Sequence, residues 1–257
     1  MTNTEQPLVS IITVCFNSQD TIEDTILSVI NQTYENIEYI IIDGGSTDGT
    51  IDIIKKYEGR ISKYISEPDQ GIYDAMNKGI NLSKGKLIHI LNSDDRYYND
   101  KIVESIIKVY LQNKNVDIFH GQILKKYKRF DSIKKVKHPL AMLKKTMVLY
   151  HPSFFVNRKA YERYGKFKSD VFKISADYEW TLRCYCNNAF FYSIDILLVE
   201  MNDGGISSNN MLNIIKEDYI ARKLNEINYF YNMAFSIRRL LYLILEKLRN
   251  VVVNGKR

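Results

Sequence analysis

The chain has 257 residues and is 45% hydrophobic and 12% aromatic, which suits one large α/β domain and excludes a disordered protein. Three cysteines and an N-terminal segment without the basic and apolar regions of a signal peptide exclude a disulfide-stapled secreted domain and favour a reducing cytoplasm. The net charge of +6 is unevenly placed: residues 123–145 carry nine Lys or Arg against Asp131 alone, and residues 211–257 carry nine against four acidic residues. The rest of the chain is net acidic, which suits a site that binds a cation. The two basic segments suit an anionic surface such as membrane phosphate or nucleic acid, or they are solvated faces.

The first half of the chain alternates strand-like and helix-like segments, which is typical of βαβ units and a mostly parallel sheet. Apolar runs predict strands over 8–16, 37–42, 61–66 and 86–91. Helices are expected from Asp20, with Glu23 completing a capping box, to Asn31, and over 50–57 and 72–82. Polar clusters follow each strand, and the carboxyl ends of parallel strands share one edge. The sequence therefore predicts a binding site at that edge.

The second half is less regular. We expect a helix over 102–110, strands over 116–124 and 150–156, and a helix over 176–186 that opens with Asp177 and Glu179. The tail from about 210 to 253 is helical, and Arg238, Arg239 and Glu246 interrupt its apolar stretches, so it could lie on a membrane rather than cross it. These patterns predict a domain over 1–209 and a C-terminal amphipathic helical extension over 210–257.

Two acidic points carry the candidate chemistry. Asp43 ends a strand before Gly44 and Gly45, where it could accept hydrogen bonds from a base or ribose or simply form a turn. Asp94 and Asp95, in NSDD, follow another buried strand without a nearby His or Cys, which suits Mg²⁺ or Mn²⁺. The alternative for NSDD is a helix N-cap, and Asp94 comes too early for that role. The glycine spacings match neither a dinucleotide-binding motif nor a phosphate loop.

Five segments resemble family 2 glycosyltransferases of the GT-A fold in order and spacing: SIITVCFN, IEYIIIDGGSTDGT, SEPDQGIYDAMNKGI, GKLIHILNSDD and ISADYEW. The resemblance covers roughly residues 7–205 and is strongest to bacterial enzymes of exopolysaccharide, capsule or lipopolysaccharide synthesis. It implies a GT-A, Rossmann-like α/β fold and metal-dependent, inverting transfer from a nucleoside-diphosphate sugar, typically a UDP-sugar, to a glycan or lipid-linked acceptor. It also implies a cytoplasmic enzyme, peripheral at the inner face of the cell membrane, without a nucleic-acid partner.

The resemblance also assigns residues. Val14 and Phe16 should line the nucleotide pocket, and Asp43 should bind the base. Asp94 matches the metal-binding end of a D-x-D motif whose first position is Asn92 here, which leaves Asp94 and Asp95 as metal ligands. Asp177 matches the catalytic base, an ionised carboxylate at neutral pH. The donor-side segment contributes three further nucleotide-sugar-binding residues: Asp69, Asp74 and Lys78.

Acceptor contacts are less constrained by the sequence. Trp180 lies one helical turn beyond Asp177 and could stack on a sugar or belong to the core, and His151 could touch a sugar or be structural. The glycines of MNDGGISS (201–208) fit a lid or a plain turn. The alternatives for the whole chain are a non-catalytic nucleotide-sugar-binding or membrane-scaffold protein of the same fold, a glycoside hydrolase, and a nucleotidyltransferase.

Overall fold

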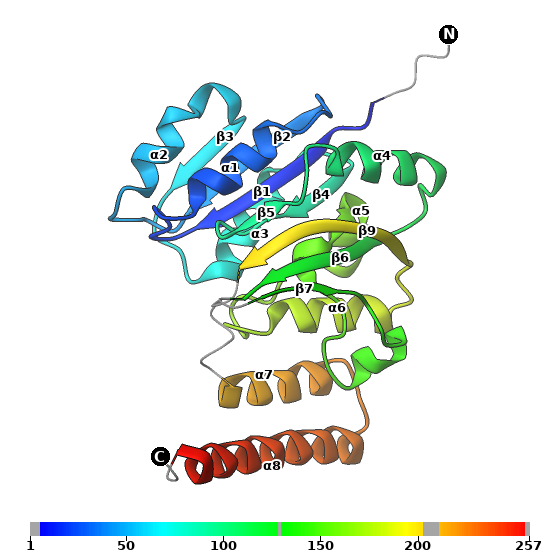
Figure 1. Cartoon of the computed structure of the whole chain (residues 1–257). Helices are drawn as coiled ribbons and strands as arrows, with labels where there is room; N and C mark the ends of the chain where they lie inside the picture. The colour runs from blue at the N-terminus through cyan, green and yellow to red at the C-terminus, as the bar shows by residue number, and fades with distance from the viewer. Residues whose placement is uncertain (1–5, 128–129, 203–210, 255–257) are drawn as a thin grey trace.

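The computed structural model describes residues 6–127, 130–202 and 211–254, with side chains described as far as residue 241. Its first half alternates strands and helices as expected (Figure 1). In order these are β1 (Val9–Cys15), α1 (Ile22–Ile30), β2 (Ile37–Asp43), α2 (Thr50–Lys56), β3 (Lys63–Ser66), α3 (Ile72–Leu82) and β4 (Leu87–Ile90). The capping box predicted at Asp20 is wrong, because α1 begins after Thr21 without a side-chain cap.

The second half contains elements that the sequence patterns predicted and others that they missed. The predicted elements are α4 (Ile102–Gln112), β6 (Ile118–Lys126), β8 (Phe155–Asn157) and α6 (Ala176–Cys186). The segment 150–156 is mostly a 3₁₀ turn, His151–Ser153, and only its end joins β8. Five elements were not expected: β5 (Asp95–Tyr97), β7 (Asp131–Lys134), a 3₁₀ turn Leu140–Lys144, α5 (Arg158–Tyr164) and the long β9 (Phe191–Asn202).

All strands belong to one sheet in the order β3-β2-β1-β4-β8-β6-β9-β5, with β7 paired to β6. Strands β1 to β4 pair in parallel, and so do β6 and β9. Antiparallel pairings join β8 to β4 and to β6, β5 to β9, and β7 to β6. The parallel half aligns the carboxyl ends of four strands at one edge, and β8 links it to the second half.

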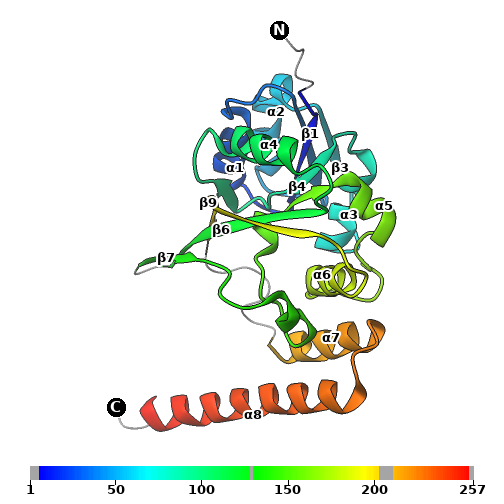
Figure 2. The ribbon, with the colours of Figure 1, turned by 90° about the vertical axis from the view of Figure 1, so that its right-hand side faces the viewer.

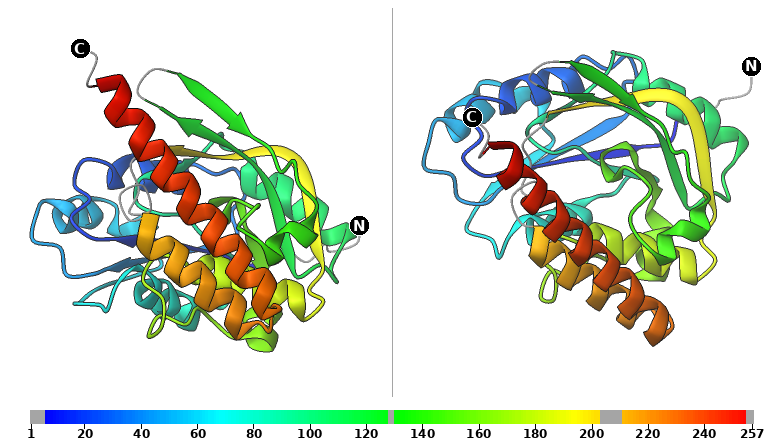
Figure 3. Two further views of the ribbon diagram at one scale, coloured as in Figure 1. Left: turned by 90° about the horizontal axis from the view of Figure 1, so that it is seen from below. Right: turned by 60° about the horizontal axis from the view of Figure 1, so that its bottom comes forward.

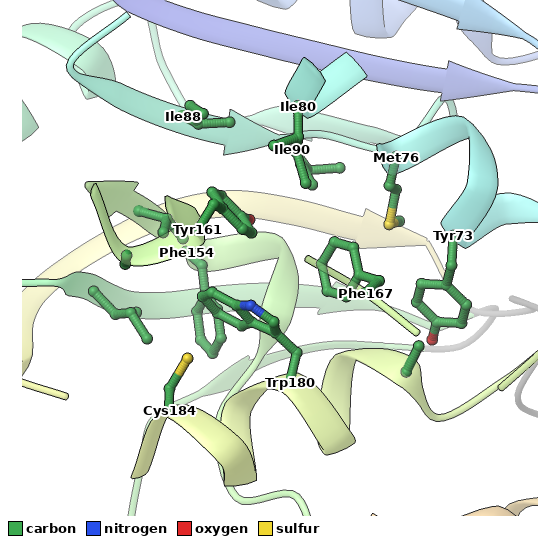
Figure 4. Packing of buried hydrophobic residues seen from close by; sticks show 14 of the residues in the cluster. Tyr73, Met76, Ile80, Ile88, Ile90, Phe154, Tyr161, Phe167, Trp180 and Cys184 are labelled. Atoms are coloured by element: carbon green, nitrogen blue, oxygen red, sulfur yellow. The ribbon is translucent and has the colours of Figure 1, made fainter. Parts of the chain in front are cut away.

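Helices cover both faces of the sheet, and each face has its own hydrophobic core (Figure 2). Helices α1, α2 and α4 pack on one face, and α3, α5 and α6 pack on the other. Strands β1 and β4 are buried along their whole length, because a parallel sheet covered on both sides leaves no face for water. Aromatic side chains fill the core between the sheet and helices α3, α5 and α6. There Trp180 of α6 stacks on Tyr161 of α5 and lies beside Phe167 (Figure 4).

The chain continues into two helices, α7 (Met211–Leu224) and α8 (Tyr229–Asn254), which lie below α6 in Figure 1. Ala221 of α7 is fully buried and belongs to the core that contains α6. Helix α7 is therefore packed onto the body of the protein, and α8 packs on α7. The division at residue 209 remains a prediction.

Candidate functional site

Four polar turns meet at the carboxyl edge of β1, β2, β3 and β4. The strand register places Cys15 beside Asp43 and Asp43 beside Ser66. The turn after β4 joins them, because the Ser93 N–H donates to the Val14 carbonyl and the Ser93 and Ser18 hydroxyls lie 2.9 Å apart. The edge that the sequence patterns indicated is therefore where these polar segments gather.

Asp43 is fully buried, and groups of the protein itself occupy its carboxylate. It accepts hydrogen bonds from the N–H groups of Gly45 at 3.0 Å and Ser46 at 2.9 Å, and from the Ser66 hydroxyl at 2.7 Å. The Ser46 hydroxyl donates to its other oxygen. Because these hydrogen bonds come from the protein itself and the residue is fully buried, Asp43 shapes the turn after β2. The expected contact with a base stays a prediction.

Asp69 and Phe16 flank Gly44, next to Asp43. A Cβ atom at Gly44 would lie 2.6 Å from Asp69 Oδ2 and 3.4 Å from the Phe16 ring, so a larger residue here would displace the Asp69 carboxylate. Asp69 Oδ1 accepts the Gly71 N–H at 2.8 Å, which fixes the carboxylate over Gly44. Phe16 is 62% exposed, whereas Val14 is only 4% exposed. The side chains open to a ligand are thus those of Phe16 and Asp69, whereas the Val14 side chain is buried.

Asp74 and Lys78 brace the loop that carries Asp69. Lys78 Nζ lies 2.9 Å from Glu67 and 3.6 Å from Asp74, and it donates to the Pro68 carbonyl at 3.3 Å. Asp74 also accepts the Gln70 N–H at 3.1 Å. These contacts hold the loop between β3 and α3 in place, which is a supporting position behind the expected donor contacts.

The turn Asn92–Asp95 differs from the Asp43 turn because its oxygens lack donors. Asn92 donates to Asp95 Oδ2 at 3.1 Å, but Asn92 Oδ1 and Asp95 Oδ1 are buried without a hydrogen-bond partner. Burial raises the pKa of Asp94. Burial and the neighbouring Asp94 charge raise the pKa of Asp95 well above its usual range. Two adjacent carboxylates and two unsatisfied oxygens are a net acceptor site, which a cation would stabilise.

The donor set of this turn fits Mg²⁺ or Mn²⁺. Both ions prefer oxygen ligands and commonly take one or two carboxylates from the protein, with phosphates and water completing the coordination. Among residues 6–127, 130–202 and 211–254, no three His, Cys, Asp or Glu side chains form a group that could bind a metal alone. The residues present therefore suit an ion shared with a phosphate-containing ligand better than a structural metal.

Asp177 lies in the first turn of α6 and is half-buried. Its Oδ1 accepts hydrogen bonds from the Tyr73 hydroxyl at 3.0 Å and from the Tyr178 N–H at 2.8 Å. Burial raises the pKa of Asp177, and these hydrogen bonds partly oppose that rise. The carboxyl is therefore a stronger base than a free aspartate, with one oxygen held in a fixed orientation.

Contacts with α3 and with the loop before it tie Asp177 to the donor-side segments. Tyr73 is on α3, shortly after Asp69, and its hydroxyl also contacts the Ile174 carbonyl at 2.6 Å. Lys173, just before α6, donates to the Gln70 carbonyl at 2.9 Å. The start of α6 thus adjoins the Asp69 loop, although the two are more than 100 residues apart in sequence.

Glu217 of α7 is a residue that the sequence analysis missed. Its carboxylate accepts the N–H groups of Lys173 at 3.1 Å, Ile174 at 2.9 Å and Ser175 at 2.8 Å. The N-cap residue Ser175 makes no side-chain cap, and Glu217 accepts its backbone N–H and those of the two residues before it, which fixes the chain where α6 begins. The available signal was that Glu217 is one of four acidic residues in a basic tail, and it does not reveal this contact.

The two candidate acceptor residues belong to the core, which is one of the two alternatives that the sequence left open for each of them. Trp180 is fully buried, donates its Nε1–H to the Gly165 carbonyl at 2.8 Å and stacks on Tyr161 (Figure 4). His151 is 7% exposed, packs edge-on against Phe154 and Phe167, and burial lowers its pKa to about 4. Neither ring is placed to bind a sugar. The glycines of the expected lid, 204 and 205, lie outside the described residues.

The fold is an α/β fold whose acidic turns gather at one edge of the sheet, and comparison with known proteins identifies its family. The sequence profile of glycosyl transferase family 2 matches residues 10–183. An uncharacterized glycosyltransferase of Mycobacterium tuberculosis is 30% identical over 250 residues, covering 94% of this chain and 91% of the relative. This chain belongs to glycosyl transferase family 2.

Other similar proteins include a teichuronic acid biosynthesis glycosyltransferase of Bacillus subtilis, 41% identical over 109 residues, covering 41% of this chain and 43% of the relative. Among solved structures, S. aureus TarS 1–349 in complex with UDP superposes with a TM-score of 0.69 at 15% identity, covering 91% of this chain and 70% of that one. A Pyrobaculum calidifontis mannosyltransferase in complex with GDP-Man and Mn²⁺ gives 0.64 at 14% identity, covering 98% and 80%. These structures confirm the expected GT-A fold.

Proposed function

We propose that this chain transfers a glycosyl group from a nucleoside-diphosphate sugar, a UDP-sugar in the first place, to an acceptor hydroxyl with inversion, in the synthesis of a bacterial cell-surface polysaccharide. The observation that carries the proposal is the placement of two chemically different carboxylate sites at one sheet edge. The Asn92–Asp95 turn has oxygens without donors, and Asp177 has a raised pKa beside the Asp69 loop.

The donor side is assigned to the turns after β1, β3 and β4. Phe16 and Asp69 offer an exposed ring and a fixed carboxylate for the nucleoside. Asp94 and Asp95, with Asn92 Oδ1, would hold Mn²⁺ or Mg²⁺, which neutralises charge on a departing diphosphate. The TarS structures with UDP and UDP-GlcNAc and the mannosyltransferase with GDP-Man and Mn²⁺ support this type of donor and ion.

The acceptor side is assigned to Asp177. The hydrogen bonds from Tyr73 and from the Tyr178 N–H both end on Oδ1, which leaves Oδ2 to accept the proton of an acceptor hydroxyl. As that proton moves to Asp177, the alcohol oxygen bonds to the anomeric carbon and the bond to the diphosphate oxygen breaks on the opposite face. The product therefore has the inverted anomeric configuration.

The test is a donor panel with product analysis. We expect the full chain with Mn²⁺ to release nucleoside diphosphate slowly from one nucleotide sugar in water. Proton NMR of the freshly released sugar should show the anomer opposite to that of the donor. Retention of configuration would contradict the mechanism. Donor binding without turnover of any donor, with or without candidate acceptors, would instead indicate a non-catalytic nucleotide-sugar-binding protein.

The relatives suggest the biological setting of the reaction. The B. subtilis relative is named for teichuronic acid biosynthesis, and a Mycobacterium bovis relative, 24% identical over 220 residues, is named for PGL/p-HBAD biosynthesis. Both names refer to the assembly of cell-envelope glycans or glycolipids. We place this chain at the cytoplasmic face of the membrane, with a glycan or lipid-linked acceptor.

A further inference from the structure

Helix α8 packs onto the protein through its polar side. Arg222 of α7 is 2% exposed and donates to Asn232 Oδ1 at 2.7 Å and to the Ser236 hydroxyl at 2.9 Å. Arg239 pairs with the buried Asp218 of α7, and the Asn232 amide donates to the Tyr219 carbonyl at 3.0 Å. The face of α8 that a soluble helix would turn to water is therefore the face that holds it to α7.

The opposite side of α8 is apolar and exposed. Phe230 is 80% exposed, Tyr229 60%, Leu241 54% and Ile237 50%. With Met233 and Leu240, these residues recur at spacings of three and four and so lie on one side of the helix. We call these six residues the apolar stripe. An inverted amphipathic helix of this kind indicates that something apolar covers the stripe.

The exposed charged side chains near α8 indicate what kind of surface covers the apolar stripe. Lys216, Lys223 and Arg238 are exposed on α7 and α8. The hairpin of β6 and β7 carries part of the lysine-rich segment 123–145, and β7 lies toward the same side as the C-terminal end of α8 (Figures 2 and 3). This hairpin also exposes Phe130 and Ile133. Apolar side chains among cationic ones match the acyl boundary and anionic headgroups of a bilayer.

Two other arrangements fit less well. A second copy of the chain would bring the same excess of positive charge against the stripe, which opposes self-association. Among the described residues, no helix is both long and apolar enough to cross a membrane. We propose that the apolar stripe of α8, together with the exposed cationic side chains of α7 and α8, docks the protein on an anionic lipid surface.

The experiment is vesicle co-sedimentation with the full chain. Vesicles of phosphatidylcholine with phosphatidylglycerol should retain the wild type about tenfold better than vesicles of phosphatidylcholine alone. The double variant Phe230→Ser/Ile237→Ser should lose about tenfold of that binding, because it removes buried apolar contact without changing charge. The matched control Leu111→Ser/Phe190→Ser, at exposed apolar positions outside α8, should bind like the wild type.

Two further measurements keep the result interpretable. Unchanged melting temperatures would exclude unfolding as the cause of lost binding, and slow donor hydrolysis should persist in the Phe230→Ser/Ile237→Ser variant, since docking is separate from the chemistry. Lys216→Gln/Lys223→Gln/Arg238→Gln should weaken binding to the anionic vesicles only. Failure of the wild type to bind anionic vesicles would overturn the proposal. So would a dimer in light scattering that the stripe variant dissolves, because that outcome makes a second copy the occupant.

Discussion

Two acidic turns lie at the same edge of the sheet, and they differ in whether protein groups donate hydrogen bonds to their side-chain oxygens. Two backbone N–H groups and two serine hydroxyls donate hydrogen bonds to the Asp43 carboxylate. At Asn92–Asp95, two buried oxygens have no donor and the pKa values of Asp94 and Asp95 are raised. A carboxylate that accepts several hydrogen bonds from the protein stabilises its own turn. A buried carboxylate without such donors is available to a ligand. The sequence alone presents both as acidic strand ends.

The comparison predicts the largest effect at Asp177, where only Oδ1 receives the hydrogen bonds of Tyr73 and Tyr178. Asp177→Asn should lower the rate of glycosyl transfer by about 10³-fold, because the amide cannot accept the acceptor's proton. Rates at saturating donor would measure this. Asp170→Asn, in the exposed loop before α6, is the matched control and should stay near the wild-type rate. Full activity of Asp177→Asn would remove Asp177 as the base.

Asp43→Asn should destabilise the fold rather than the chemistry. The new amide group would face N–H and O–H donors in a fully buried position, at a cost of about 3 kcal/mol in the free energy of unfolding. Urea denaturation would show it, with the exposed Asp52→Asn on α2 as the control. A stable Asp43→Asn variant with weakened nucleotide binding would reverse the assignment of the two turns.

The buried imidazole of His151 is a third titratable group whose pKa is shifted by burial. Its pKa is about 4 in the folded protein against about 6.5 in the unfolded chain, so the folded state binds fewer protons between these values. The contribution of His151 to stability is therefore full above pH 6.5 and is lost as pH falls toward 4. Between pH 7 and pH 5, His151→Leu should lose about 2 kcal/mol less stability than the wild type. Equal losses in both proteins would contradict the burial of a neutral ring.

Glu217 tests whether α7 contributes to the site from a distance. Glu217→Gln leaves an amide N–H group opposite backbone donors at the start of α6 and should reduce kcat about tenfold, with the donor KM nearly unchanged. Glu217→Asp should restore part of the rate, and the exposed Glu226→Gln should have no effect. A change confined to the donor KM would show that Glu217 does not act through Asp177.

The smallest expected effect is at Gly44. A methyl group there meets Asp69 Oδ2 at 2.6 Å, and because this atom ends a flexible side chain, the carboxylate can move aside. Gly44→Ala should therefore weaken donor binding about threefold, near 0.7 kcal/mol, with little change in the melting temperature. Gly59→Ala, where a Cβ meets nothing within 4 Å, is the control. Unchanged donor affinity in Gly44→Ala would separate Asp69 from the nucleoside.

The sequence patterns predicted the parallel half well because its signals are local. Isoleucine-rich strands and polar turns alternate at short intervals up to β4, and the roles that the resemblance assigns to Asp94 and Asp177 stay predictions. Strand β9 was missed because Asp195 and Glu200 interrupt its apolar pattern, whereas its pairing partner β6 lies about 70 residues earlier. Strand pairing over that distance leaves no local signal.

The surroundings of the site residues could not be predicted where they depend on groups that are distant in the sequence. Asp43 is completed partly by Ser66, which comes from another strand. Trp180 shares a helix face with Asp177, but one turn further along α6 that face enters the aromatic core. Residue spacing places both side chains on one side of the helix without showing where the rim of the site ends. For the same reason Glu217 could not be assigned before its contacts were known.

The most direct test of the two-site account is calorimetry of UDP binding, with and without Mn²⁺, for the wild type, Asp94→Asn and Asp177→Asn. We expect Mn²⁺ to tighten UDP binding in the wild type, Asp94→Asn to lose most of that gain, and Asp177→Asn to bind within about twofold of the wild type. An equal loss of Mn²⁺-dependent UDP affinity in Asp94→Asn and Asp177→Asn would contradict the separation of the cation turn from the base.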